Sequence, residues 1–176
     1  MVIDQGGIMQ HLRRIGLFST LLFLLTNLTT AALAKPFTYV NARFGTVCTF
    51  PDKIFSKRMP EPENGDGLEW QSADGASVAC YGSYNALDDT PDSLVQNEKA
   101  SPEPGEKVTY SKTGKKWAVL SGTKGDNIFY RRSVFGKEDV VHTVFIEYPA
   151  ALKAKYDPLV GAIAASLHEA TGPHSK

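Results

Sequence analysis

The second half of the chain is a close succession of strand-prone segments joined by turns of a few residues. This pattern limits the fold more than any other feature of the sequence. Residues 107–112, 115–122, 127–135 and 140–148 are rich in aromatic and β-branched side chains, and turns with glycine separate them. Connections this short join antiparallel strands, because a parallel pair needs a crossover of a dozen or more residues. The pattern therefore predicts an antiparallel meander.

Further strands precede the meander. Residues 37–50 are aromatic and β-branched, with a break near residues 41–45, and predict one or two strands. Residues 68–72 and 76–84 flank an Asp-Gly pair, which is a hairpin signal. Between these regions, residues 57–67 collect proline, glycine and acidic side chains, and they predict a surface loop.

Two helices are predicted. Thr90 provides a capping hydroxyl and Pro91 a proline in the first turn, which predicts a short helix ending near Ala100. The C-terminal region begins a helix over residues 150–155, and Asp157-Pro158 is expected to restart it. Apolar residues then recur at helical spacing on one stripe.

The strands over residues 127–135 and 140–148 carry apolar side chains on both faces. A sheet open to water on one side alternates more sharply between apolar and polar residues. We therefore predict an α+β fold in which an antiparallel β-sheet has helices packed on both faces, an α/β/α sandwich. The C-terminal helix would cover one face, and the helix over residues 90–100 would cover the other together with loops.

The first 34 residues have the composition of a secretory signal peptide. Arg13 and Arg14 precede an apolar stretch over residues 15–25, and Ala32-Leu33-Ala34 places small residues where a signal peptidase cleaves. The same segment also suits an uncleaved membrane anchor, although its apolar part is shorter than the ~20 residues of a spanning helix. Met9 is an alternative start to Met1, because it would give a shorter charged region.

The expected organisation is a signal peptide over residues 1–34, a single α+β domain over 35–170 and a flexible tail over 171–176. Cleavage removes two of the 19 basic residues and one of the 19 acidic ones, which leaves 17 and 18 and a formal charge of −1. Such a balance predicts no binding to nucleic acid or to an anionic membrane surface. We expect a periplasmic or secreted protein with no membrane span after cleavage, whose partner is an envelope protein or a small ligand.

Cys48 and Cys80 are the two cysteines of the chain. An even count in an exported protein favours a disulfide, and each cysteine lies in a predicted strand. A reactive thiol or a metal-binding pair is the alternative, but the C-x-x-C spacing and the nearby histidine typical of metal sites are missing. On a chain-entropy argument the bond would stabilise the fold by about 3–4 kcal/mol.

The order of elements resembles a known superfamily. Ala42 to Pro51, Ala-Arg-Phe-Gly-Thr-Val-Cys-Thr-Phe-Pro, is similar to the aromatic-Gly and aromatic-Pro opening of the PsbP/Mog1-like superfamily. The close, Val-Phe-Ile-Glu-Tyr-Pro over residues 144–149 and a helix finishing Ile-Ala-Ala-Ser-Leu at Leu167, is similar as well. The resemblance spans most of residues 37–168 and extends to small exported bacterial proteins with this layout. It implies a non-enzymatic binding or assembly module, and it transfers no site residues.

His142 is the histidine that lies inside a predicted element. A general base or metal ligand needs companions within hydrogen-bond distance. His142 shares its strand face with Val144 and Ile146, which favours a histidine in the core or at a sheet edge. The chain has no nucleophile-elbow, zinc-protease or P-loop motif, so we predict no catalytic residues and no cofactor.

Acidic residues gather in two loops and could in principle bind Ca²⁺, which takes six or more oxygen ligands. Their spacing matches no EF-hand loop, and the helix start already explains one of them. Solvated loop charge is the favoured interpretation, and no metal is expected at Glu61, Glu63, Asp66, Asp88, Asp89 and Asp92.

Aromatic and polar residues on neighbouring predicted strands form the candidate ligand site. Rings can stack on a ligand, and an arginine can bind a carboxylate or a glycan. The alternative is that Trp70 and Trp117 are core residues. The predicted ligand-binding residues are Trp70, Tyr81, Tyr84, Asn85, Tyr130 and Arg132.

These observations favour an exported periplasmic module that binds a ligand or another envelope component without catalysis. The alternative is a small envelope hydrolase or transferase that uses His142 and loop carboxylates.

Overall fold

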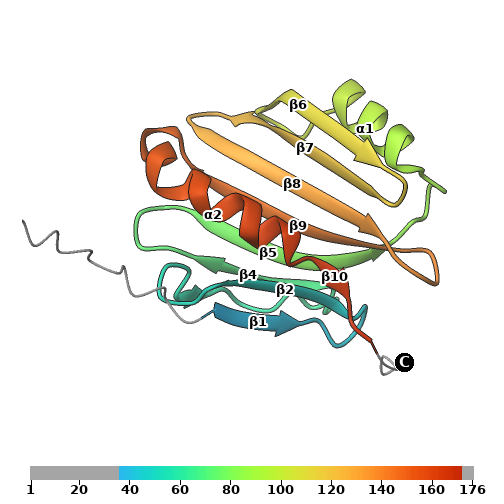
Figure 1. Cartoon of the computed structure of the whole chain (residues 1–176), viewed down its shortest axis with the longest axis horizontal. Coiled ribbons are helices and arrows are strands. Elements are labelled where there is room, and N and C mark those ends of the chain that lie inside the picture. The colour runs from blue at the N-terminus through green and yellow to red at the C-terminus, as the bar shows by residue number, and fades with distance from the viewer. Residues whose placement is uncertain (1–35, 172–176) are drawn as a thin grey trace, which may run out of the picture. The chain divides into compact units, whose positions relative to one another are not determined.

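The computed structural model describes residues 36–171, and the predicted signal peptide lies outside them. The described chain forms a seven-stranded antiparallel sheet in the order β3-β4-β5-β9-β8-β7-β6, and a three-stranded sheet in the order β1-β2-β10 (Figure 1). The elements are β1 (Pro36–Val40), β2 (Thr46–Pro51), β3 (Lys57–Arg58), β4 (Gly67–Gln71), β5 (Ser77–Tyr84), α1 (Pro91–Ala100), β6 (Glu106–Gly114), β7 (Trp117–Lys124), β8 (Asn127–Phe135), β9 (Val140–Pro149), a 3₁₀ turn (Ala150–Leu152), α2 (Lys153–Ala165) and β10 (His168–Glu169).

The predicted meander is present. Strands β6, β7, β8 and β9 follow one another in both sequence and space, and each pairs antiparallel with the next. The predicted hairpin over residues 68–84 is β4 and β5, and β5 continues the sheet by pairing with β9. Short turns join the strands of the meander and of the β4–β5 hairpin, which is why the sequence pattern revealed those pairs. The pairing of β5 with β9 joins segments far apart in the sequence.

The two faces of the large sheet follow from the alternation of side chains along its strands. Cys80 and Val144 pair with each other in the register, and Tyr130 lies on the same side of the sheet. We call this side the disulfide face. Phe129 and Arg131 are on the other, which we call the Arg131 face.

The main core lies on the disulfide face. There α2 and β2 pack side by side over the middle of the large sheet (Figure 1). The buried cluster includes Phe50 and Cys48 from β2, Val144 and Ile146 from β9, and Tyr156 from α2. A second, smaller core on the Arg131 face joins α1 with β7 and β8 through Val95, Ala118, Leu120 and Phe129.

The α+β class and the antiparallel sheet are as predicted, but the predicted helix layers on both faces are not shown. Among the described residues there are only two α-helices, and the second sheet shares the disulfide face with α2. The prediction missed this second sheet because the pattern of residues 37–50 indicates strands but does not indicate which sheet they join.

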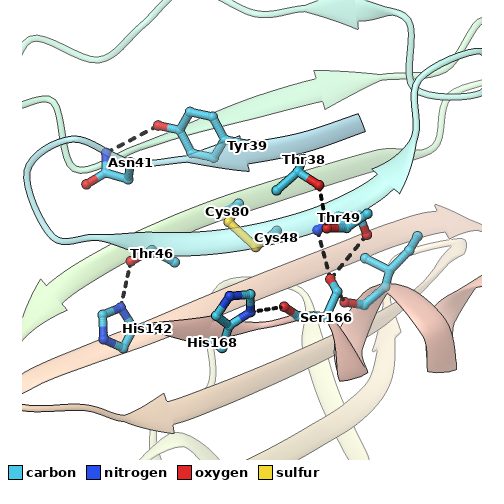
Figure 2. Close-up of a disulfide and its surroundings, with 11 residues drawn as sticks. Thr38, Tyr39, Asn41, Thr46, Cys48, Thr49, Cys80, His142, Ser166 and His168 are labelled. Atoms are coloured by element: carbon cyan, nitrogen blue, oxygen red, sulfur yellow. Dashed lines mark hydrogen bonds between the residues drawn. A yellow bond between two sulfur atoms is a disulfide. The ribbon is translucent and has the colours of Figure 1, made fainter. Parts of the chain in front are cut away.

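The disulfide joins the two sheets. Cys48 on β2 and Cys80 on β5 are fully buried, and their Cα atoms are 6.2 Å apart (Figure 2). The predicted bond is therefore present, although it links facing layers rather than neighbouring strands. It closes a separation of 32 residues, for which the chain-entropy argument gives about 3–4 kcal/mol.

The first helix begins as its capping signal predicts. The Thr90 hydroxyl accepts from the Ser93 amide, and the Ser93 hydroxyl accepts from the Thr90 amide, so that each satisfies a backbone donor at the helix start. The second helix differs from the prediction, because α2 continues through Pro158 rather than restarting there. Its buried side chains, Tyr156, Val160 and Ile163, hold it across the proline.

Two short strands were not predicted. β3 lies inside the expected loop over residues 57–67 and pairs with β4, and β10 lies between the predicted C-terminal helix and the predicted tail over residues 171–176. In β10, His168 pairs with Val47 of β2, so the end of the chain completes the small sheet. Two-residue strands carry no periodic pattern, which is why the sequence did not reveal them. No helix among the described residues is long and apolar enough to cross a membrane.

Candidate functional site

The structure does not bring the six predicted ligand-binding residues into one site. Trp70 belongs to the main core, where its side chain is 5% exposed. Its ring centroid lies 4.8 Å from that of Phe50 and 5.0 Å from that of Tyr39. Trp70 is therefore a packing residue beneath the small sheet and cannot reach a ligand at the surface.

Tyr81, Tyr84 and Asn85 line a cavity of about 230 Å³ between the sheet, α1 and the loop that precedes α1. The side chain of Asn85 is engaged within that loop. Its amide nitrogen donates to the Asp89 carbonyl at 2.9 Å, and its oxygen accepts from the Asp89 amide at 2.9 Å. This amide closes the loop, so it is not available to bind a ligand.

The floor of the same cavity is a charge cluster on the Arg131 face. Arg131 forms ion pairs with Glu98 of α1 and with Glu106 of β6, the latter at 2.9 Å. The Lys124 ammonium lies 3.6 Å from Glu106. Burial raises the pKa of Glu98, and Arg131 opposes that rise. Burial likewise raises the pKa of Tyr81. Since the cations and carboxylates compensate one another, this cluster fixes α1 on the sheet.

Tyr130 and Arg132 lie on the other side of the sheet, on the disulfide face. Tyr130 lines a cleft of about 510 Å³ between β6, β7 and β8 on one side and α2 on the other. The Arg132 guanidinium lies 5.0 Å from the centre of the Trp117 ring, close enough for a cation–π contact. Tyr130 and Arg132 therefore lie on one surface. Trp117 lies on the same surface, and it is not a core residue.

The rest of that surface comes from the edge strand β6. A β-bulge between Val108 and Tyr110 inserts Thr109 as an extra residue. Lys107 pairs with Thr123 before the bulge, and Tyr110 pairs with Ser121 after it. Side chains alternate along a strand, so without the bulge Lys107 and Tyr110 would point to opposite faces. With it, both point to the disulfide face.

We call this surface the open face, because α2 packs mainly on β8 and β9 and the small sheet on β5 and β9, which leaves the β6–β7 side of the disulfide face largely uncovered. Tyr110 is 52% exposed, and the lysines beside it are exposed as well. Burial raises the pKa of Tyr130, while the Arg132 charge lowers it and the Tyr110 phenol raises it, which places the three groups near one another. The open face consists of Lys107, Tyr110, Lys112, Trp117, Tyr130 and Arg132.

The cleft beside the open face ends at a hydrogen-bonded group on α2. The Tyr148 hydroxyl donates to Asp157 at 2.7 Å, and Lys153 pairs with the same carboxylate. The Lys153 hydrogen bond lowers the pKa of Asp157, and Tyr148 adds to the effect. Asp157 is therefore a compensated anion. Thr109, Ser121 and Thr123 line the opposite wall, and the Ser121 hydroxyl donates to the Phe129 carbonyl at 2.8 Å.

Charge is segregated along the chain, which its net balance conceals. Residues 52–106 contain twelve acidic and four basic residues. Residues 107–124, which form β6 and β7, contain five lysines and no acidic residue. The expectation that the domain offers no electrostatic footprint to nucleic acid or to an anionic membrane surface rested on net charge alone. The distribution of charge gives a basic hairpin at one edge of the sheet.

His142 is not part of any surface site. Its side chain is fully buried, and Nδ1 lies 2.8 Å from the Thr46 hydroxyl, which is also buried (Figure 2). Gly136 lies against it, because an added Cβ there would stand 2.4 Å from His142 Nε2 and 3.1 Å from Glu169 Oε2. An imidazole closed to solvent cannot act on a substrate, so the arrangement gives no support to hydrolase chemistry at His142.

The acidic residues considered for Ca²⁺ are separated or already hydrogen-bonded. Asp89 accepts from the side chains of Ser93 and Asn97, and Asp92 accepts from Thr113 at 2.6 Å. Within residues 36–171, no three His, Cys, Asp or Glu side chains are grouped so that they could hold a metal ion.

Comparison with known proteins supports the fold. No protein-family model matches the chain, and no curated protein matches it. Among solved structures, it is similar to the solution structure of cyanobacterial PsbP (CyanoP) from Synechocystis sp. PCC 6803. The match has a TM-score of 0.55 and 11% sequence identity, and it covers 83% of this chain and 99% of the other.

The chain therefore has a PsbP-like fold, as the resemblance in its sequence indicated. At this identity the likeness concerns the fold alone.

Proposed function

We propose that this protein is an exported, non-catalytic binding module of the cell envelope, and that the open face with its adjoining cleft is the binding site. In this proposal α1 and α2 act as the helix layers of the predicted α/β/α sandwich, and α2 forms one wall of the site. Tyr130 and Arg132 contribute to binding, whereas Trp70 supports the core.

The disulfide and the N-terminal segment support export. A buried disulfide is typical of proteins that fold in an oxidising compartment. Arg13, Arg14 and the apolar stretch that follows them have the order of a signal peptide, with a cleavage site after Ala34. Two independent features thus favour the periplasm or secretion over the cytosol.

The observation that carries the binding role is the composition of the open face. Tyr110 is more than half exposed, Trp117 and Tyr130 are half-buried, and basic residues surround them. Aromatic side chains grouped on one surface are more typical of binding sites than single exposed rings, and rings with polar tips are enriched where proteins bind ligands. Within residues 36–171, the one carboxylate on β6, β7 and β8 is Glu106, and it lies on the Arg131 face. The open face therefore offers rings and cations without a general base on these strands.

Hydroxyl-radical footprinting tests the proposal. The processed chain, residues 35–176, would be incubated with the cell-envelope fraction of the organism that produces it, and oxidation would be measured residue by residue. We expect envelope material to protect Tyr110 and Trp117 at least twofold, because both side chains would be covered by the ligand.

Tyr84 is the internal control, since it is 62% exposed and lies outside the open face. Protection of Tyr110 with Tyr84 unchanged supports the site. Equal oxidation of Tyr110 with and without envelope material would refute the binding role.

A further inference from the structure

From the open face we infer the class of ligand: an anionic polysaccharide, such as a glycan chain that carries uronate groups. The inference rests on the proposed binding function and goes beyond it by naming the chemistry that is recognised. Its starting point is that the open face combines uncompensated positive charge, flat aromatic rings and a wall of hydroxyl groups.

The positive charge of the open face has no partner within the described chain. Lys107 and Lys112 are exposed, and neither forms an ion pair with a residue in 36–171. Arg132 likewise has no carboxylate partner there, and its guanidinium lies over Trp117. On the Arg131 face, by contrast, each cation of the buried cluster is matched by a glutamate. The open face therefore offers its charge to an external anion.

The aromatic residues of the open face suit sugar rings. Tyr110 and Tyr130 are neighbours on this face, because both pair with Ser121 of β7. Trp117 lies against Gly114, where an added Cβ would stand 2.2 Å from the indole nitrogen, and the Arg132 guanidinium lies over its ring. The exposed Tyr110 ring therefore offers the free flat apolar surface. Such a surface can stack on the face of a pyranose ring, whose C–H groups are apolar, while arginine and lysine bind the carboxylate groups.

The cleft extends the surface in one direction. Thr109, Ser121 and Thr123 line it from the sheet, and Lys153 and Asp157 line it from α2. Hydroxyl and carboxylate groups beside a stacking platform are suited to the many hydroxyl groups of a glycan. A platform that continues into a polar cleft fits an extended chain better than a single small anion.

Protection of the sheet edge is the simpler explanation for the lysines. Lysines on an edge strand prevent pairing with another chain, and β6 is the edge strand. A bulge in an edge strand serves the same role. Edge protection does not explain the exposed Tyr110 on the same face as both lysines, since a tyrosine side chain does not protect an edge.

A membrane surface is a poorer fit to the same residues. Proteins that bind anionic bilayers insert protruding apolar side chains between lipids and surround them with lysines. Here the hairpin tip carries Lys115 and Lys116, and the rings lie on the sheet behind them. The charge could attract a bilayer, but the shape offers nothing to insert.

The test uses polygalacturonate as the uronate-bearing probe and isothermal titration calorimetry at about 0.15 M salt. The comparison probes are neutral dextran, vesicles of phosphatidylcholine with phosphatidylglycerol, and a single-stranded oligothymidylate. We expect polygalacturonate to bind the processed chain, dextran not to bind, and the affinity for polygalacturonate to fall as salt increases. Binding of the vesicles or the oligothymidylate in preference to polygalacturonate would overturn the inference.

Two double variants with equal loss of charge locate the site. Lys107→Gln with Lys112→Gln should weaken polygalacturonate binding about fivefold, since each exposed charge pair contributes modestly to affinity. Lys53→Gln with Lys57→Gln, near the opposite edge strand β3, should leave it unchanged. Tyr110→Ala should also weaken binding, and circular dichroism would confirm that each variant folds.

The outcomes separate this inference from the proposed function. If envelope material protects Tyr110 in footprinting but polygalacturonate does not bind, the site stands and the ligand class is wrong. If the two double variants weaken binding equally, the attraction is non-specific and the inference is wrong.

Discussion

At the scale of single residues, Arg131 is the charged side chain on which the stability of the fold depends most. Its side chain is 11% exposed, and that of its partner Glu106 is 1% exposed. A charge in this environment is stable only with its partner, because removing one member leaves the other desolvated. This explains why α1, which contributes Val95 as its one buried residue, stays on the sheet.

Replacement of Arg131 by methionine should destabilise the protein strongly. We expect the free energy of unfolding to fall by about 3–5 kcal/mol, because Glu106 would stay buried with only Lys124 nearby. Urea denaturation measures the change. The matched control is Arg58→Met, which breaks an exposed pair with Glu61 and should cost less than about 0.5 kcal/mol. Equal costs would contradict the assigned role of Arg131.

Asp74 controls stability at acid pH. The Lys155 hydrogen bond lowers the pKa of this carboxyl from 3.8, and Tyr156 and Ser72 add to the effect. The folded state therefore favours the charged form, so this contribution is present above pH 3.8 and is lost as the pH falls below it.

Asp74→Asn should flatten the loss of stability between about pH 4 and pH 2, measured as urea midpoints at several pH values. Asp52→Asn changes an exposed carboxylate for which the structure shows no ion pair, and it should leave the slope unchanged. The interpretation fails if the Asp74 variant keeps the wild-type slope.

The individual site residues show where sequence reasoning reaches its limit. Tyr130 and Arg132 lie together on the open face, because neighbours two apart on a strand share a face. Tyr81 was grouped with them, but the register puts it on the Arg131 face. Tyr110 was not among the predicted residues, since only the bulge at Thr109 brings it and Lys107 to the same face, and no local signal in the sequence marks that bulge.

At the scale of elements, the two glycines that line the cleft have opposite roles. Gly161 lies within α2, and an added Cβ there would meet no atom within 4 Å. Gly122 lies in β7, where a Cβ would stand 1.9 Å from the Lys107 carbonyl oxygen. The first glycine weakens its helix, whereas the second allows β6 and β7 to approach at the bulge.

Gly161→Ala should raise the free energy of unfolding by about 0.5–1 kcal/mol, because alanine loses less backbone entropy in a helix. Gly122→Ala should lower it and displace β6, since the clash is with backbone rather than a flexible side chain. Thermal denaturation of both variants measures whether each substitution raises or lowers the stability. A stabilised Gly122 variant would contradict the assigned close approach of β6 and β7.

The elements were predictable where a local signal is strong. The Thr90 cap and Pro91 gave the start of α1, and short turns gave the strands of the meander. Helix α2 was expected to restart at Pro158, but burial of Tyr156 and Val160 outweighs the hydrogen bond that proline cannot make. Tertiary packing decided that case, and it is not visible in a local pattern.

At the scale of the whole molecule, the two properties that matter for function are the cross-link between the sheets and the segregation of charge. The pairing of Cys48 with Cys80 could be predicted from compartment and count, whereas the second sheet that it fastens could not. The balanced net charge concealed the basic hairpin over residues 107–124, because a net charge does not show where along the chain the charged residues lie.

Export from the cytosol is the claim on which the proposed function and ligand depend. Intact-mass spectrometry of the native protein, after alkylation of free thiols, tests it most directly. We predict a chain that begins at Lys35 and takes up no alkylating reagent, because Cys48 and Cys80 are joined. A chain that retains residues 1–34 and carries two alkylated cysteines would contradict the account.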